Sequence, residues 1–236
     1  MNQFAKAFTP DKLEEAWHVF LTEFPMGLWE TVYVTLLATL FAIVLGLPLG
    51  ILLVTGDEKG IRPMPKLLMK VINVLINFLR SVPFLILIVM VIPLTRAIIG
   101  TSIGSVASIV PLVVAAFPFV ARLVESSLRE LDPNIIEMAQ SMGASTWEIV
   151  SRVMLPESVP SLVTNFTLAI TTILGYTAMS GAMGGGGLGK IAINYGYSRY
   201  KYAVLYLAVI VLVLLVQVFQ SIGTRLAAKL DKRIKK

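Results

Sequence analysis

Long runs of apolar residues alternate with short polar segments along this chain, and the runs have the length of membrane-spanning helices. A helix needs about 20 apolar residues to cross the hydrocarbon core of a bilayer. Five segments meet this requirement: Thr31 to Thr55, Val71 to Thr95, Thr101 to Ala121, Val159 to Met183, and Tyr202 to Gly223. The pattern predicts an all-α polytopic membrane protein with about five transmembrane helices.

The residues before the first run are amphipathic and do not read as a signal peptide. Acidic residues interrupt any apolar core there, and the basic start of a signal peptide is missing. Between Pro10 and Phe24 the apolar residues recur at helical spacing, as Leu13, Ala16, Trp17, Phe20 and Leu21. We expect this helix to lie on the membrane surface.

Composition supports the membrane interpretation, and the distribution of charge gives the chain an orientation. Hydrophobic residues make up 56% of the chain and charged residues 14%, with a mean hydropathy of +0.82. Five spans place the termini on opposite sides. If the C-terminus is cytoplasmic, thirteen of the 20 basic residues lie inside: Lys59, Arg62, Lys66, Lys70, Arg122, Arg129, Arg152, Arg225, Lys229, Lys232, Arg233, Lys235 and Lys236. Six lie outside: Lys6, Lys12, Arg96, Lys190, Arg199 and Lys201. The positive-inside rule therefore favours an outer N-terminus and an inner C-terminus.

Several functional classes are disfavoured by what the sequence contains. The net charge of +6 comes from basic residues beside apolar runs, which fits membrane orientation better than nucleic-acid binding. There is no cysteine, and the one histidine, His18, is expected to be solvated, so neither a thiolate nor a histidine metal site is predicted. A membrane-embedded enzyme would lack acid–base groups. No predicted span carries an acidic residue, which argues against a proton relay.

The polar segment from Ile135 to Pro160 lies between the third and fourth apolar runs, on the predicted cytoplasmic side. Asp132 and Pro133 suit a helix start, with a capping side chain followed by proline in the first turn. We expect one apolar face to carry Ile136, Ala139, Met142 and Gly143. Such a short helix either docks into a groove of a soluble partner or rests on lipid headgroups.

A second short helix is predicted from Thr146 to Met154. Trp147, Val150 and Met154 would share one side of it. We expect it to end at Leu155 and Pro156, because proline cannot continue the hydrogen-bond ladder of a helix interior.

The spacing within this segment resembles the EAA loop of ABC importer permeases. Glu137-Met138-Ala139 is followed after three residues by Gly143 and after nine more by Val153-Met154-Leu155-Pro156. The family pattern has alanine where Met138 stands and isoleucine where Val153 stands, and both replacements keep an apolar surface. The segments FLRSVPF, IPLTRAIIGTSIG, GYTAMSGAMGGGGLGKI and NYGYSRY extend the resemblance to the permease subunit of methionine importers, from Trp29 to Arg225.

This resemblance implies a type I ABC importer permease in the bacterial inner membrane that forms the translocation pathway as a homodimer. Its partners would be two ATP-binding subunits and an extracytoplasmic substrate-binding lipoprotein. The chain itself would be non-catalytic and without a cofactor, since Mg-ATP would bind the partner ATPase and no P-loop is present here. The coupling residues would be Glu137, Ala139, Gly143, Val153, Leu155 and Pro156. The predicted parts are an outer N-terminal segment over 1–27, a permease domain over 28–225 with its coupling loop over 133–160, and a basic cytoplasmic tail over 226–236.

Three residues in the spans are candidates for the pathway, each with a structural alternative. Arg80 is a charge inside a predicted span, so it either serves the pathway or a gate, or anchors the chain to its dimer partner or loops. Asn165 and Tyr176 could line a water-filled path for a zwitterion or mediate helix packing.

The glycine run Gly184 to Gly189 formally contains G-x-G-x-x-G. It follows an apolar span, so the dinucleotide interpretation lacks its strand. We expect a loop where backbones pack closely on the outer side, near which a binding protein could dock.

Two other functions stay open from the residues. One is an ABC permease for another small amino acid or a short peptide, because specificity rests largely with the binding protein. The other is an ion-coupled carrier acting alone, for which neither inverted repeats nor intramembrane acids are found.

Overall fold

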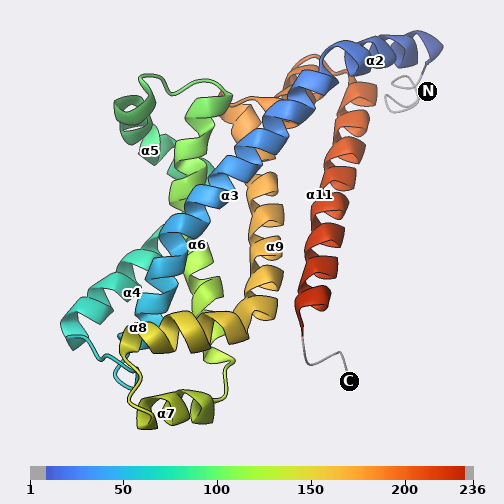
Figure 1. Cartoon of the computed structure of the whole chain (residues 1–236). Helices are drawn as coiled ribbons and strands as arrows, with labels where there is room; N and C mark the ends of the chain where they lie inside the picture. Colours follow the sequence, from blue (N-terminus) through green and yellow to red (C-terminus); the bar gives the residue numbers. More distant parts are fainter. Residues whose placement is uncertain (1–8, 232–236) are drawn as a thin grey trace. The chain divides into compact units, whose positions relative to one another are not determined.

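The structure, a computed structural model, describes residues 9–231, and these are almost entirely helical (Figure 1). The long elements are α2 (Pro10–Thr22), α3 (Phe24–Thr55), α4 (Lys66–Ser81), α5 (Phe84–Ile99), α6 (Ser105–Arg129), α9 (Leu155–Ser180) and α11 (Tyr202–Leu230). The short ones are α7 (Pro133–Ser141), α8 (Thr146–Glu148), the π-helical turns η1 (Ile149–Met154) and η3 (Ala192–Ser198), the 3-10 turn η2 (Gly181–Met183) and α10 (Gly187–Ile191). The all-α prediction is confirmed.

Four helices in the described residues are long and apolar enough to span a membrane, or five if a bent pair counts as one span. The bent pair is α4 and α5, which meet at 114°. The prediction of a single helix from Val71 to Thr95 is therefore wrong. Val82 has ψ 124° and Pro83 has ψ 135°, both extended. Proline disfavours the helical conformation of the residue before it, so the chain turns there.

Three other predicted boundaries also shift. The helix predicted from Thr101 begins only at Ser105, because Gly100 and Gly104 adopt positive φ in the preceding loop. α3 begins at Phe24, so Glu30 lies inside this helix and not ahead of the span. α11 runs on to Leu230, so the first part of the predicted tail over 226–236 is helical, and residues 232–236 lie outside the described range. Residues 1–8 of the predicted outer segment also lie outside it.

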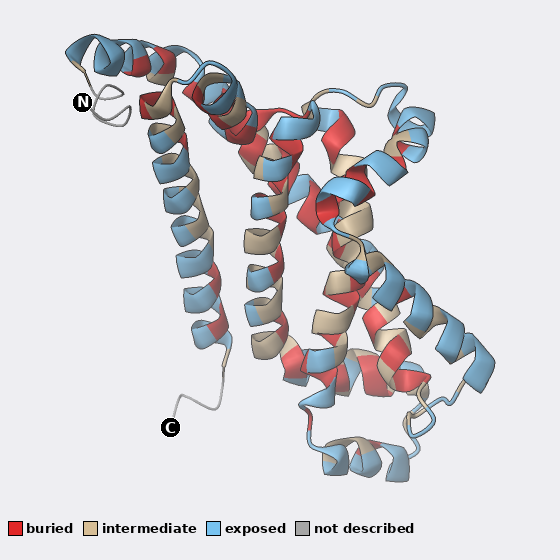
Figure 2. Ribbon diagram, turned by 180° about the vertical axis from the view of Figure 1, so that it is seen from behind, coloured by how far each residue is buried: buried red, intermediate tan, exposed pale blue. Residues whose placement is uncertain are grey.

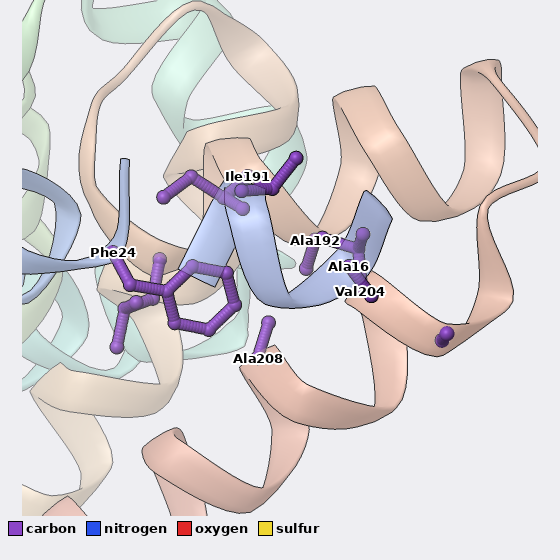
Figure 3. Close-up of a cluster of buried hydrophobic side chains, with 9 residues drawn as sticks. Ala16, Phe24, Ile191, Ala192, Val204 and Ala208 are labelled. Atoms are coloured by element: carbon purple, nitrogen blue, oxygen red, sulfur yellow. The ribbon is translucent and has the colours of Figure 1, made fainter. Parts of the chain in front are cut away.

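The chain divides into two compact units. Unit 1 comprises the residues up to Thr39, Pro83–Val113 and Ile170–Val218. Its core joins α2 and the start of α3 to α10, η3 and α11, and Figure 3 shows Phe24 beside Ala208 and Ala16 close to Ala192 and Val204. Threonines on α3 are also buried here, and Thr35 Oγ1 lies 3.3 Å from Thr177 Oγ1.

Unit 2 comprises Leu40–Val82, Val114–Ala169 and the residues from Phe219. Part of its core is formed by Leu53 of α3, Ile76 of α4 and Ala121 of α6, with Leu49, Met69 and Ile72 packed against them. All the residues of the predicted coupling segment belong to this unit.

Candidate coupling site

Helix α7 begins as the sequence predicts. The Asp132 side chain caps it by accepting the backbone N–H of Asn134 at 2.9 Å, and Pro133 occupies the first turn. Proline fits there because its missing N–H would have no partner inside the helix. Glu137, Met138 and Ala139 follow on this helix, so the first part of the motif lies on a capped, regular element.

Gly143 turns the chain after α7. Its φ is +78°, a conformation that side chains with a Cβ rarely adopt. A Cβ at this position would meet no atom within 4 Å, so the glycine is required by the backbone conformation and not by crowding. The turn is closed by a hydrogen bond from the Ala144 N–H to the Ala139 carbonyl at 3.1 Å.

A capping box that the apolar pattern does not indicate starts the next helix, α8 (Thr146–Glu148). Glu148 Oε2 accepts the Ser145 N–H at 3.0 Å, and Ser145 Oγ accepts the Glu148 N–H at 3.4 Å. The signal was present in the sequence, since a serine followed three residues later by glutamate is the pattern of this motif.

The predicted helix end at Leu155 and Pro156 is wrong. Helix runs without interruption from Thr146 through Met183, and Pro156 lies in the first turn of α9. The π-helical turn η1 comes directly before it, and the Leu155 N–H bonds to the Val150 carbonyl five residues back. Because the wider turn shifts the bonding by one residue, the proline avoids the carbonyl with which it clashes in a regular α-helix.

The two parts of the motif come together, since α7 lies against η1 in unit 2. Ala139 is 2% exposed, and Ile149, Val150 and Met154 of the facing segment are buried. Val153 and Leu155 are partly buried, and Pro156 is exposed. Ala139 therefore supports the helix from within, and its small side chain lets α7 approach the turn closely.

The outward residues of this segment differ from the predicted face. Met142 and Gly143 are exposed and do not share the buried side of Ala139, and Trp147 is separated from the buried Val150 and Met154. The exposed fractions are 58% for Met138, 74% for Met142 and 76% for Trp147. Figure 2 shows most of α7 as exposed surface. We call Met138, Met142 and Trp147, together with the exposed Glu137, the docking surface.

A polar network beside α7 was also missed by sequence reasoning. Arg129 at the end of α6 bonds Asp57 Oδ2 at 2.9 Å and Glu125 Oε1 at 2.9 Å. Arg122 bonds Glu125 Oε2 at 2.6 Å and reaches Asn73 Oδ1 on α4 at 2.7 Å. Charge counting assigned both arginines to orientation alone. Their contacts show that they also tie α4, α6 and the α3–α4 loop together.

The Arg129 guanidinium and then the Glu58 backbone N–H lower the pKa of the Asp57 carboxyl, because both donate hydrogen bonds to its charged form. A pocket of about 530 Å³ opens between this network and α7. Its polar lining includes Asp57, Lys59, Arg129, Glu137 and Gln140. Within residues 9–231, no group of three His, Asp or Glu side chains is placed to hold a metal ion.

The three pathway candidates have different surroundings. Arg80 is exposed in the last turn of α4 and makes no hydrogen bond or ion pair with the described residues. Asn165 donates its side-chain N–H groups to Ser127 Oγ at 2.8 Å and to the Leu123 carbonyl at 3.3 Å, both on α6. The Tyr176 ring stacks on Phe84 with the centroids 4.5 Å apart. The contacts of Asn165 and Tyr176 are those of packed helices.

The glycine run is a tightly packed seam in unit 1. Gly187 has φ +80° and donates its N–H to Glu30 Oε2 at 2.6 Å, and Leu188 donates to Thr31 Oγ1 at 2.9 Å. A Cβ on Gly187 would lie 2.5 Å from Thr31 Oγ1. A Cβ on Gly189 would lie 2.2 Å from the backbone carbonyl oxygen of Ala178, so the predicted close approach of backbones is present. Glu30, which precedes the first predicted span, binds the backbone at the start of α10.

Comparisons with known proteins agree on one family. The family model described as the binding-protein-dependent transport system inner membrane component matches residues 42–236. A probable D-methionine transport system permease protein MetI of Vibrio cholerae is 44% identical over 206 residues, which is 87% of this chain and 91% of that protein. The corresponding protein of Pasteurella multocida is 47% identical over 205 residues, covering 86% and 94%.

Solved structures show the same relation. A chain from the MetNI methionine ABC transporter in inward-facing conformations is 43% identical, with a TM-score of 0.84, and the match covers 86% of this chain and 94% of that one. An amino acid ABC transporter crystallised with histidines has a TM-score of 0.70 over 96% of this chain and all of its own. At 21% identity, the second match is evidence of a shared fold alone.

Proposed function

The chain belongs to the family of binding-protein-dependent transport system inner membrane components, and from this premise we propose that it is the permease subunit of an ATP-driven methionine importer. The observation that carries the proposal is the EAA-like segment, folded as a capped helix whose Glu137, Met138 and Met142 are exposed. Relatives named for methionine transport, at 44% and 47% identity over most of the chain, support the substrate.

The proposed assembly contains two copies of this chain, two ATP-binding subunits and an extracytoplasmic binding protein, in the bacterial cytoplasmic membrane. ATP binding and hydrolysis belong to the partner subunits. The likeness to a chain of the MetNI transporter supports this composition. The N-terminus would be outside and the C-terminus in the cytoplasm, which places α7 where an ATPase can reach it.

The docking surface is the proposed contact with the ATPase. The ATPase can shift the permease between conformations only by binding one of them better than the other. Glu137, Met138, Met142 and Trp147 would make that contact. Ala139, Gly143, Val153, Leu155 and Pro156 would hold α7 against the helix that continues into α9, so that a movement of α7 reaches the span.

The test of coupling is a charge placed on the docking surface. Met142→Asp should leave the fold intact, because the side chain is 74% exposed, and should lower ATP-dependent uptake by tenfold or more. Met142→Leu, which keeps an apolar side chain of similar size, should retain uptake. Normal uptake by Met142→Asp in proteoliposomes would contradict the docking assignment.

The test of function is uptake of labelled methionine into proteoliposomes that hold the permease, the ATPase and the binding protein. Concentrative uptake should require all three and ATP. A tenfold excess of other amino acids should compete only as far as the binding protein accepts them. Accumulation of methionine in proteoliposomes that hold this chain alone would contradict the proposal and favour a carrier.

For the pathway we propose an exposed side of α9 that a second copy would face. Gly175 lies on this helix, and a Cβ there would meet no atom within 4 Å of the same chain. Glycine within a helix is about 1 kcal/mol less favourable than alanine, so its presence points to a requirement outside the chain. Gly175→Leu should reduce uptake without loss of membrane insertion. Arg80, Asn165 and Tyr176 remain candidates, and uptake by Arg80→Gln, Asn165→Ala and Tyr176→Phe tests them.

A further inference from the structure

Helix α2 carries three distinct faces, of which the protein covers one. Ala16 and Val19 are 1% and 7% exposed and pack with Phe24 against α10, η3 and the beginning of α11 (Figure 3). Figures 1 and 2 both show α2 lying across the end at which α11 begins. The face predicted from sequence is thus split, because Ala16 and Phe20 turn toward the protein while the other apolar residues do not.

The covered face is reinforced by polar contacts to η3 and to the residues between η3 and α11. Glu15 forms an ion pair with Lys201, and Tyr195 donates its hydroxyl hydrogen to Glu23. The Arg199 guanidinium lies 4.7 Å from the centre of the Tyr195 ring. These contacts tie α2 to residues 195–201, so α2 is an integral part of unit 1.

The second face is an apolar flank spaced at every fourth residue. Leu13, Trp17 and Leu21 are 47%, 57% and 59% exposed, and they lie on one side of the helix because residues four apart are neighbours. The Trp17 ring stacks on Phe20 with the centroids 5.3 Å apart, which fixes its orientation.

The third face is polar and mostly acidic. Asp11, Glu14 and His18 are exposed and line a pocket together with Arg199 and Lys201. At 100° per residue, Asp11 and His18 share one side of the helix, about 110° from the centre of the flank, and Glu14 lies at the border between the two. An apolar flank beside a charged face is the arrangement of a helix that lies in a membrane interface.

We propose that the Leu13, Trp17 and Leu21 flank is seated in the bilayer, at the boundary between headgroups and acyl chains. The flank lies close in sequence to the spanning helix α3, which starts two residues after α2 ends. Met26 and Trp29 on the first turns of α3 are 60% and 62% exposed. Tryptophans are enriched at this depth because the ring is apolar and its N–H is polar. This inference does not depend on the transported substrate.

The charge on α2 restricts the kind of lipid. Helix α2 carries three carboxylates and one lysine, and a fourth carboxylate, Glu23, follows it directly. Anionic headgroups attract basic segments, so an acidic helix gains nothing from them and is held by apolar contact alone. Because α2 is also tied to residues 195–201, a helix seated in lipid would restrain those residues relative to the bilayer.

The experiment uses single cysteines, since the chain has none. Leu13→Cys and Leu21→Cys on the flank, and Asp11→Cys and His18→Cys on the acidic face, would carry a nitroxide in nanodiscs of zwitterionic lipid. Collisions with oxygen, which concentrates in lipid, and with a water-soluble nickel chelate would be measured by electron paramagnetic resonance.

We expect oxygen access to exceed nickel access at positions 13 and 21, and nickel access to exceed oxygen access at positions 11 and 18. Adding anionic lipid should not move the labels at positions 13 and 21 deeper into the bilayer. Higher nickel access at 13 and 21 would overturn the proposal in favour of a solvated face. Low access to both reagents there would overturn it in favour of a protein partner. Equal elution of the four labelled proteins on gel filtration controls for misfolding.

Discussion

At the residue scale, the same residue type serves opposite purposes, which the sequence does not distinguish. A side chain at Gly187 is excluded by the positive φ and by the nearby Thr31, whereas a Cβ at Gly175 would meet no atom within 4 Å. Glu30 and Thr31 stand at the boundary of the first predicted span, yet their side chains bind the first backbone N–H groups of α10, far along the chain. Nothing local in the sequence predicts such a pairing, because it depends on how α3 meets α10.

Gly187→Ala should destabilise the protein, and Gly175→Ala should not. The left-handed conformation costs about 1–2 kcal/mol for a residue with a Cβ, and the new Cβ would also press on Thr31 Oγ1. Gly175→Ala should be neutral or stabilising by up to about 1 kcal/mol through helix propensity. Thermal unfolding in detergent compares the two. Equal melting temperatures would show that the seam is not rigid.

Asp57 predicts a pH dependence. The pKa of its carboxyl is lowered in the folded state, so its pairing with Arg129 stabilises the fold above the ordinary value of 3.8 and is lost as the pH falls through the lowered value. Asp57→Asn should therefore lower stability at pH 7, with a difference that shrinks toward pH 3. Thermal unfolding of both proteins from pH 3 to 7 measures it. If the two proteins differed in stability by the same amount at every pH, the stability lost in Asp57→Asn would come from packing and not from the ion pair.

At the element scale, the existence of the helices was predictable and their breaks were not. Apolar runs and the Asp132–Pro133 start identified the spans and α7, since period and length are properties of the sequence itself. Pro83 breaks a helix and Pro156 does not, although both are prolines in helical segments. The difference comes from the π-helical turn before Pro156 and the extended Val82 before Pro83. The docking surface was also assigned imperfectly, because the packing of α7 on η1 decides which residues face outward.

The capping box of Ser145 and Glu148 should matter for coupling as well as stability. Ser145→Ala removes the acceptor of the Glu148 N–H, and loss of such a cap costs about 1 kcal/mol. We expect a lower melting temperature and a lower ratio of uptake to ATP hydrolysis, since α8 joins α7 to the span. Ser141→Ala is the matched control, because Ser141 only bonds the Glu137 carbonyl within its own helix. Equal effects of both substitutions would show that the capping box has no specific role in coupling.

At the scale of the whole molecule, charge predicts the orientation and the family implies the partners. Residues at the two ends should be accessible from opposite sides of the membrane. His18→Cys and Lys229→Cys, each the single cysteine of its chain, can be labelled with a membrane-impermeant maleimide in intact cells and in inverted vesicles. We expect His18→Cys to react in cells and Lys229→Cys only in inverted vesicles. The reverse pattern would place α7 outside, beyond reach of an ATPase.

Cross-linking from Met142→Cys carrying a benzophenone, in membranes that contain the ATPase, tests whether a cytoplasmic ATPase binds α7. We expect a covalent adduct of the two subunits whose yield changes when ATP is added, and no such adduct from Glu14→Cys on α2. Absence of the adduct from position 142 in a complex that still transports methionine would contradict the proposed contact between α7 and the ATPase.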